Sequence, residues 1–204
     1  MTLERREFLA DVAVHALGLA LGAAGVAAML AVAVREQLLP VTVYLAGLLA
    51  MLGCSAVYHV WRSCRRRDWL RRLDHAAIFV MIAGTYTPLA LRLPAGWALG
   101  LTAGVWTAAL AGVVVKLVQP RRIETLSVAL YLLLGWVGVI AAEPLLASLD
   151  QVTVVLLVAG GVVYSAGVAF HLAAHWRYAR ALWHGSVLIA AAIHYAAIMA
   201  LLQA

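Results

Sequence analysis

Three ionisable side chains mark the ends of long apolar runs. His59 closes one run, Asp74 opens the next, and His184 lies at the start of the last. Ser55 precedes His59 by four residues, so the two share one face of a helix. Imidazole and carboxylate groups are ligands that zinc uses in proteins, and a carboxylate near the metal can deprotonate water. These four residues form the candidate site if the fold brings them together.

Each of these residues also has a simpler interpretation. His59 and His184 suit hydrogen-bonded or snorkelling side chains at a membrane interface. Asp74 could neutralise a neighbouring arginine or cap its helix, and Ser55 could be a small packing residue bonded to its own backbone. A carboxylate at the edge of a membrane is costly without a partner. We therefore expect Asp74 to have one, and the two histidines are candidates.

The composition places the chain in a membrane. It has 204 residues, of which 66% are hydrophobic and 12% charged, far from the balance of a soluble globular domain. Its uncharged stretches are each close to the roughly 20 residues that cross the hydrocarbon core of a bilayer. They predict an all-α fold, a single domain of seven transmembrane helices over residues of about 10–34, 38–61, 74–92, 95–117, 123–142, 151–176 and 181–203.

The positive charges set the predicted topology. Of the 15 Lys and Arg residues, Arg35 and Arg92 fall on one side of the predicted bundle and all the others on the opposite side. The positive-inside rule then predicts a cytoplasmic N-terminus and an external C-terminus. The net charge of +6 does not indicate nucleic-acid binding, because the basic residues lie in short clusters between apolar runs.

This topology brings the candidate residues to one depth. The second helix ends near the cytoplasm with His59, and the third and seventh helices begin there with Asp74 and His184. Four more polar residues fall in the same layer: Asp11, His15, His171 and His175. The last two have the i, i+4 spacing of a zinc pair or form an interfacial patch. His194 lies about 15 Å deeper than His184, where we expect a buried hydrogen bond between helices.

Four segments carry these polar residues: EFLADVAVHALG, SAVYH, LDHAAIFVMIAGTYTP and ALWHGSVLIAAAIHYAAI. Together they resemble the hemolysin III family, the bacterial branch of the progestin and adipoQ receptor (PAQR) superfamily, over nearly the whole chain. The resemblance implies a seven-helix fold with zinc held by three histidines near the cytoplasmic leaflet. It also implies hydrolysis of lipid amides, with His59 and His184 as zinc ligands, Asp74 as the base that holds the attacking water, and Ser55 beside the site.

Two departures from the family pattern concern the metal. The resemblance places a third histidine ligand at the position of Arg180, and arginine cannot bind a metal because its guanidinium has no free lone pair. Asp11 stands where the family usually has Asn. In one interpretation, zinc keeps His59 and His184 and recruits Asp74, Asp11 or a neighbouring histidine. In the other, Arg180 replaces the metal and pairs with Asp74 or Asp11.

The two interpretations lead to two functions. A bound zinc ion would make the chain a hydrolase that acts on acyl amides of membrane lipids, in the bacterial inner membrane. An Arg180 ion pair would make it a non-enzymatic membrane-homeostasis or sensor protein, because an intramembrane charge is retained only with a partner. Proton or ion conduction is a further alternative, since the ionisable groups lie at two depths. The sequence lacks the barrel-like alternation that would support a secreted pore former.

Overall fold

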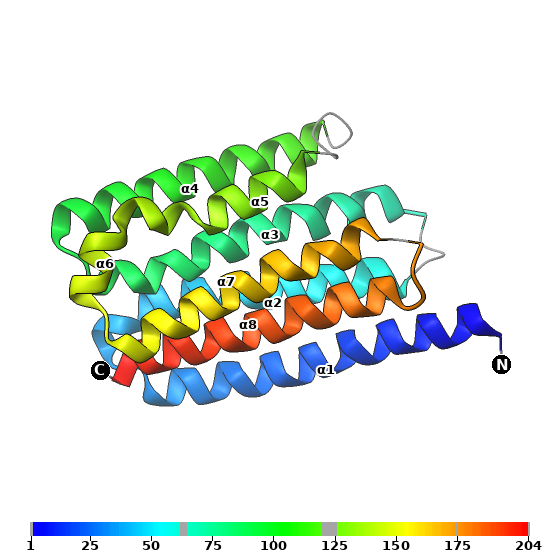
Figure 1. Cartoon of the computed structure of the whole chain (residues 1–204), viewed down its shortest axis with the longest axis horizontal. Helices are drawn as coiled ribbons and strands as arrows, with labels where there is room; N and C mark the ends of the chain where they lie inside the picture. Colours follow the sequence, from blue (N-terminus) through cyan, green and yellow to red (C-terminus); the bar gives the residue numbers. More distant parts are fainter. Residues whose placement is uncertain (1, 62–64, 120–125, 174, 204) are drawn as a thin grey trace.

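The chain folds into helices throughout the part that the structure describes. The computed structural model describes residues 2–61, 65–119, 126–173 and 175–203, and no strand occurs among them. The elements are, in order, α1 (Leu3–Val32), η1 (Arg35–Gln37), α2 (Leu38–Val60), α3 (Arg67–Leu89), η2 (Ala90–Arg92), α4 (Ala95–Val118), α5 (Ser127–Gly135), η3 (Val137–Ala141), α6 (Ala142–Ser148), α7 (Gln151–Leu172) and α8 (Ala179–Gln203) (Figure 1). The all-α prediction is confirmed.

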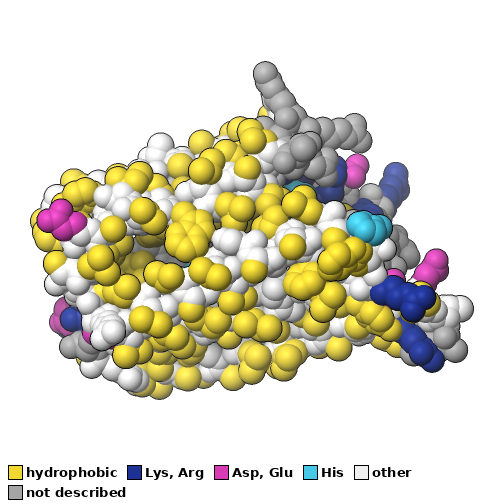
Figure 2. Space-filling model, viewed as in Figure 1, with side chains coloured by type: hydrophobic (Ala, Val, Ile, Leu, Met, Phe, Trp, Pro, Cys, Tyr) yellow, Lys and Arg dark blue, Asp and Glu magenta, His cyan; other side chains and the backbone are white. Residues whose placement is uncertain are grey.

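The outer surface of the helices is apolar. Large aliphatic side chains are exposed along them, among them Leu99, Leu133 and Ile140, which are 74%, 70% and 74% exposed. Figure 2 shows hydrophobic side chains along the length of the visible face and charged ones gathered at its two ends. Such a surface is stable in lipid, whereas in water it would drive association. The protein is therefore a multi-pass membrane protein.

Six of the described helical segments are long and apolar enough to cross a membrane, by length and composition. α3 is not among them, although its 23 residues would extend about 35 Å. Its first turns are rich in charge, with Arg67, Asp68, Arg71 and Arg72. In Figure 1, α3 lies lengthwise in the same bundle as the apolar helices. This placement favours the predicted seventh span, which stays a prediction.

Successive long helices run in alternating directions, so the two chain ends lie at opposite ends of the bundle (Figure 1). We call the end where α1, α3 and α8 begin the basic end. At the other end, the Arg92 guanidinium donates to the Leu201 carbonyl (2.7 Å), and the Gln37 amide donates to the Leu202 carbonyl (3.3 Å). These bonds satisfy carbonyls in the last turn of α8, which have no partner within the helix. That the basic end faces the cytoplasm stays a prediction.

Several helix boundaries differ from those predicted. α1 begins at Leu3 and α3 at Arg67, rather than at 10 and 74, because no Gly or Pro stops either helix from continuing past the membrane edge. The start of α3 is tied to the end of α4 by Arg72, which donates to the Leu117 carbonyl (2.6 Å). α7 ends at Leu172, before the predicted 176. The predicted start of the fifth helix, at 123, lies outside the described residues. So does position 174, within the predicted sixth helix.

The predicted fifth helix is broken within its span. α5 ends at Gly135, and η3 and α6 follow. The Tyr86 hydroxyl, from α3, donates to the Gly135 carbonyl (2.6 Å) and accepts from the Gly138 amide (2.9 Å). Irregular backbone is tolerated at membrane depth only where the protein itself satisfies the freed groups. Tyr86 satisfies two of them, so one side chain of α3 supports the break.

Glycines let α2 and α3 approach closely. A Cβ added to Gly47 of α2 would lie 3.1 Å from the Val80 carbonyl oxygen, and one added to Gly84 of α3 would lie 3.2 Å from the Val43 carbonyl oxygen. Such contact through small residues is the usual means of packing where lipid provides no hydrophobic drive between helices. It fixes the end of α2 beside the start of α3, where three of the four candidate residues, Ser55, His59 and Asp74, lie.

Candidate metal centre

One face of α1 carries the first part of the site. The buried residues of α1 are Asp11, His15, Gly18, Gly22 and Met29. Their spacing follows one side of an α-helix. A Cβ on Gly18 would lie 3.3 Å from Leu52 of α2 and 3.4 Å from Leu188 of α8. The glycine therefore allows α1 to pack against both helices, and it places Asp11 and His15 against their ends.

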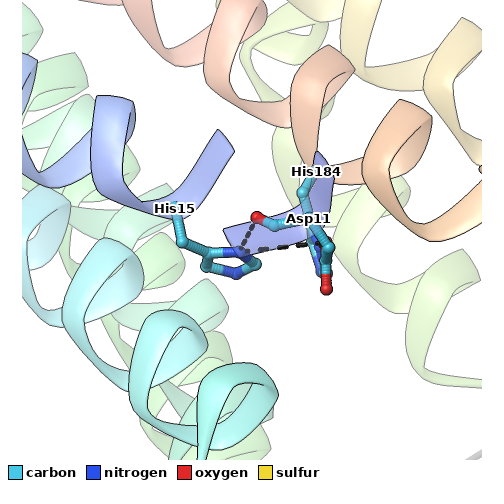
Figure 3. A group of neighbouring side chains, drawn as sticks. All are labelled: Asp11, His15 and His184. Carbon is cyan, nitrogen blue, oxygen red and sulfur yellow. Dashed lines mark hydrogen bonds and ion pairs between the residues drawn. The ribbon is translucent and has the colours of Figure 1, made fainter. Parts of the chain in front are cut away.

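Asp11 binds two histidines at once. Its carboxylate Oδ1 lies 2.6 Å from His184 Nδ1, and its main-chain oxygen lies 2.8 Å from His15 Nδ1 (Figure 3). Oδ1 is also 3.8 Å from His15 Nδ1. The Asp11 side chain is 3% exposed. A carboxylate buried at this depth needs such partners, because an unpaired buried charge is strongly destabilising.

His59 and Asp74 close the cluster from the side of α2 and α3. The His59 ring centroid lies 4.3 Å from that of His184 and 5.5 Å from that of His15, and the His15 and His184 centroids are 4.5 Å apart. His59 Nε2 is 3.7 Å from Asp74 Oδ2. Ser55 Oγ lies 3.3 Å from His15 Nε2. Three imidazoles from three helices thus meet between two buried carboxylates.

The donor set suits a divalent transition metal. Asp11, His15 and His184 each offer a ligand atom, and these atoms lie within 4.8 Å of one another. Imidazole nitrogen and carboxylate oxygen are common zinc ligands. His59 lies beside this group, with its ring centroid 4.3 Å from that of His184. The cluster could therefore hold a metal ion, and its nitrogen-rich donors favour zinc over calcium or magnesium.

The structure brings together all four residues singled out from the sequence. His59, His184, Asp74 and Ser55 lie in one cluster at the basic end. His15 joins them and matches the neighbouring histidine that the first interpretation allowed as a third ligand. The sequence places His15 in the right layer without selecting it. The signal that selects it is the buried stripe on which Asp11 and His15 precede two glycines at helical spacing.

Arg180 does not take the place that the second interpretation gives it. Its side chain is exposed, and within the described part of the chain no ion pair joins it to Asp11 or Asp74. The partner of Asp11 is His184, and that of Asp74 is His59. The physical reason is that the imidazoles lie deeper between the helices, whereas Arg180 occupies the first turn of α8, where its head reaches the interface.

Three other histidines, His171, His175 and His194, do not take part in the cluster. The His171 ring packs beside Trp183 with centroids 5.2 Å apart, and the His175 ring lies 6.2 Å from that of Trp176. Both side chains are exposed, as in an interfacial patch. His194 Nε2 lies 3.1 Å from the Leu157 carbonyl oxygen. It is the interhelical hydrogen-bonding residue that the sequence predicts.

A cavity of about 810 Å³ leads away from the cluster. At the basic end it is lined by His15, His59, Asp74 and His184, and toward the opposite end by aliphatic side chains such as Leu89 and Leu149. Its walls come from α1, α2, α3, α5, α6, α7 and α8, and they include the break in α5. The polar cluster therefore sits at one end of a long, mainly apolar space.

Comparison with known proteins gives a consistent result. The chain is 33% identical over 189 residues to the hemolysin-3 homolog of Bacillus subtilis (strain 168), covering 90% of this chain and 88% of that protein. It is 36% identical over 150 residues to hemolysin-3 of Bacillus cereus, with coverage of 72% and 68%. It is 28% identical over 163 residues to the Homo sapiens monocyte to macrophage differentiation factor, with coverage of 76% and 67%.

The mammalian match agrees with the resemblance to the wider PAQR superfamily. The family profile described as Haemolysin-III related matches residues 6–195, which include every residue of the cluster. This chain belongs to the haemolysin III-related family of integral membrane proteins.

Proposed function

We propose that the protein is a zinc-dependent hydrolase that cleaves the acyl amide bond of a membrane lipid. The observation that carries this proposal is the position of the histidine and aspartate cluster at the polar end of the 810 Å³ cavity. A ligand site of this kind combines an apolar wall, which binds, with a few convergent polar groups, which orient. An acyl chain fits the apolar length, and its carbonyl would then reach the cluster.

The histidine and aspartate cluster would form the metal site, and the metal would supply Lewis acidity toward the amide carbonyl and a water molecule. Asp74 is the general base. Its Oδ2 lies 3.7 Å from His59 Nε2, so it faces the cluster and can accept a proton from the attacking water. The water oxygen bonds to the carbonyl carbon, and the bond from that carbon to nitrogen then breaks. Asp74 returns the proton to the leaving nitrogen, and the products are a fatty acid and an amine.

The arginines at the basic end support a position for this site at the level of the lipid head groups. Arg71 and Arg180 line the cavity at the same end as the cluster, and arginines are drawn to anionic lipid head groups. A lipid whose amide lies at the level of the head groups would present its scissile bond at this depth. We place the site in the cytoplasmic leaflet of the bacterial inner membrane, as the positive-inside rule indicates.

The non-enzymatic alternative has less support. A membrane-homeostasis or sensor protein built on an Arg180 ion pair requires that pair, and the described contacts of Asp11 and Asp74 are with histidines instead. An apolar cavity that ends at a histidine cluster also has no role in such an ionic lock. The hydrolase accounts for both features.

The direct test is hydrolysis by the purified protein in lipid nanodiscs supplied with zinc. A panel of N-acyl lipids with neutral and charged head groups is incubated with the protein, and the free fatty acid and amine are measured by mass spectrometry. We expect release of both products in equal amounts, and loss of this release in Asp74→Asn. His175→Asn is the matched control, because His175 is exposed and outside the cluster. A zinc-loaded protein that releases no product from any lipid would overturn the proposal.

A further inference from the structure

The hydrogen bonds of Asp11 fix the protonation of two histidine rings. A main-chain carbonyl and a carboxylate oxygen can only accept hydrogen bonds. The nitrogens that face them, Nδ1 of His15 and Nδ1 of His184, must therefore carry the protons. A neutral imidazole with its proton on Nδ1 has its free lone pair on Nε2. Asp11 thus directs the Nε2 lone pairs of both rings away from itself. His15 Nε2 faces Ser55 Oγ at 3.3 Å, and a metal bound there would replace this contact.

His59 completes the set without any such bond. In the described part of the chain its ring nitrogens make no hydrogen bond, and its nearest charged neighbour, Asp74, is 3.7 Å away. The side chain is 17% exposed, so water satisfies it only in part. An imidazole nitrogen held among two other imidazoles without a hydrogen bond is suited to a metal.

The spacing of the three rings is that of a shared ion. Zinc binds imidazole nitrogen at about 2.0–2.1 Å with tetrahedral geometry, which sets the ring centroids of two ligands about 5 Å apart. The observed centroid separations are 4.3, 4.5 and 5.5 Å. They bracket the expected value, so the ring separations are compatible with a shared ion.

We propose, building on the metal site of the proposed function, that the ligands are His15 and His184 through Nε2 together with His59. Asp11 is then a positioning residue and not a ligand. α1 supplies the third imidazole, whereas the first turn of α8 offers Arg180, which cannot bind a metal. The Asp11 carboxylate holds His184 as carboxylates hold zinc-bound histidines in many proteins.

Charge balance favours this division of roles over Asp11 as a ligand. Three neutral imidazoles leave the two charges of a zinc ion uncompensated, and the two buried carboxylates, Asp11 and Asp74, neutralise them at short range. Asp11 Oδ1 already accepts a hydrogen bond from His184 Nδ1 at 2.6 Å. If Asp11 turned toward the metal and lost this contact, the proton on that nitrogen would lose its partner in a buried place, which is unfavourable.

X-ray absorption of the zinc-loaded, unmutated protein tests the ligand set without any substitution. Each imidazole ligand gives a distinct multiple-scattering signal, so the number of histidines can be counted. We expect three. Two imidazoles and a carboxylate oxygen would overturn the proposal and leave Asp11, His15 and His184 as the ligand set. This result would leave the proposed hydrolase intact, since either set leaves an open position.

Variants separate ligand from positioning roles through zinc affinity, measured against a competing chelator. Asp11→Asn keeps an acceptor oxygen, and we expect it to retain one zinc ion with affinity lowered about 10–100-fold. His15→Gln should lose far more, and His175→Gln, at an exposed residue outside the cluster, should match the parent. An Asp11→Asn protein that loses zinc as completely as His15→Gln would show that Asp11 is a ligand, and a His15→Gln protein with parental affinity would exclude His15. Either result contradicts the assignment.

Discussion

His184 Nδ1 lies 2.6 Å from Asp11 Oδ1, a contact that joins the first and last long helices of the chain across 173 residues. Neither residue explains the site alone. The same aspartate bonds His15 through its main chain, and His184 stacks edge-on against His59. One buried acid therefore organises a histidine cluster contributed by α1, α2 and α8.

Asp74 acts on the proton of water and does not hold the metal. We expect Asp74→Asn to lower the hydrolysis rate about 10²–10⁴-fold, because an amide cannot accept the proton. Its zinc content should equal that of the parent. Rate and zinc content are measured on the same preparation, with His175→Asn as the control, because His175 is exposed and outside the cluster. Loss of zinc together with activity would instead make Asp74 a ligand, as one interpretation of the sequence allowed.

Arg180 contributes little to stability. Because it is exposed and its described contacts include no ion pair with Asp11 or Asp74, we expect Arg180→Ala to change the free energy of unfolding by less than about 0.5 kcal/mol. A buried ionic lock would cost about 3–5 kcal/mol when broken. Chemical denaturation in detergent compares Arg180→Ala with Asp11→Ala, which removes a buried partner of His184. Equal, large losses of unfolding free energy in both variants would instead support an ion pair between Arg180 and Asp11.

The Tyr86 hydroxyl supports the break between α5 and η3. Tyr86→Phe leaves the Gly135 carbonyl and the Gly138 amide without this partner. We expect a loss of about 1–3 kcal/mol and faster hydrogen exchange of the Gly138 amide. The comparison is Tyr195→Phe, which removes a hydroxyl bond to the Gly25 carbonyl in another part of the bundle. Unchanged exchange at Gly138 in Tyr86→Phe would show that the break does not depend on Tyr86.

Asp150 makes the start of α7 sensitive to acid. Its carboxylate accepts from the Thr153 hydroxyl (2.5 Å) and the Thr153 amide (3.0 Å), and these bonds lower the pKa of Asp150 below its ordinary value of 3.8. The folded-state pKa is thus below the unfolded one. The stabilisation is fully present above about pH 4 and is lost as the pH falls through the folded-state pKa.

The measurement for Asp150 is the free energy of unfolding at about pH 5 and about pH 3. We expect a larger fall between these two values for the parent than for Asp150→Ala, because the variant has no carboxylate to protonate. Identical falls in the two proteins would remove Asp150 as a source of the acid sensitivity.

The sequence predicts the parts of this fold that depend on local patterns. Uncharged runs of membrane length locate the helices, and the alternation of their directions puts His59, Asp74 and His184 in one layer. It cannot predict the break at Gly135, because that break depends on the Tyr86 hydroxyl, which comes from a helix almost 50 residues earlier. The sequence also predicts that α3 begins at 74 and not at Arg67. The charged residues before 74 argue against a membrane span, although they are compatible with a helix.

The same distinction holds for the site. His59, His184 and Asp74 could be chosen because each is a polar residue at the end of an apolar run, and Ser55 because it shares a helix face with His59. His15 could be placed at the right depth but not selected, because its selection depends on which face of α1 turns inward. That face is fixed by the contacts of Gly18 with Leu52 and Leu188. The sequence also leaves the partner of Asp11 open, because Arg180 and His184 share one face of α8 and either could reach it.

The central claim is that the histidine cluster holds zinc, and elemental analysis of the detergent-purified protein tests it most directly. After exposure to zinc and removal of loosely bound metal, we expect about one zinc ion per chain in the parent and in His175→Gln. We expect almost none in His184→Gln, because the site has few ligands and loses one of them. A parent protein that retains no zinc, or a His184→Gln protein that retains as much as the parent, would contradict the account.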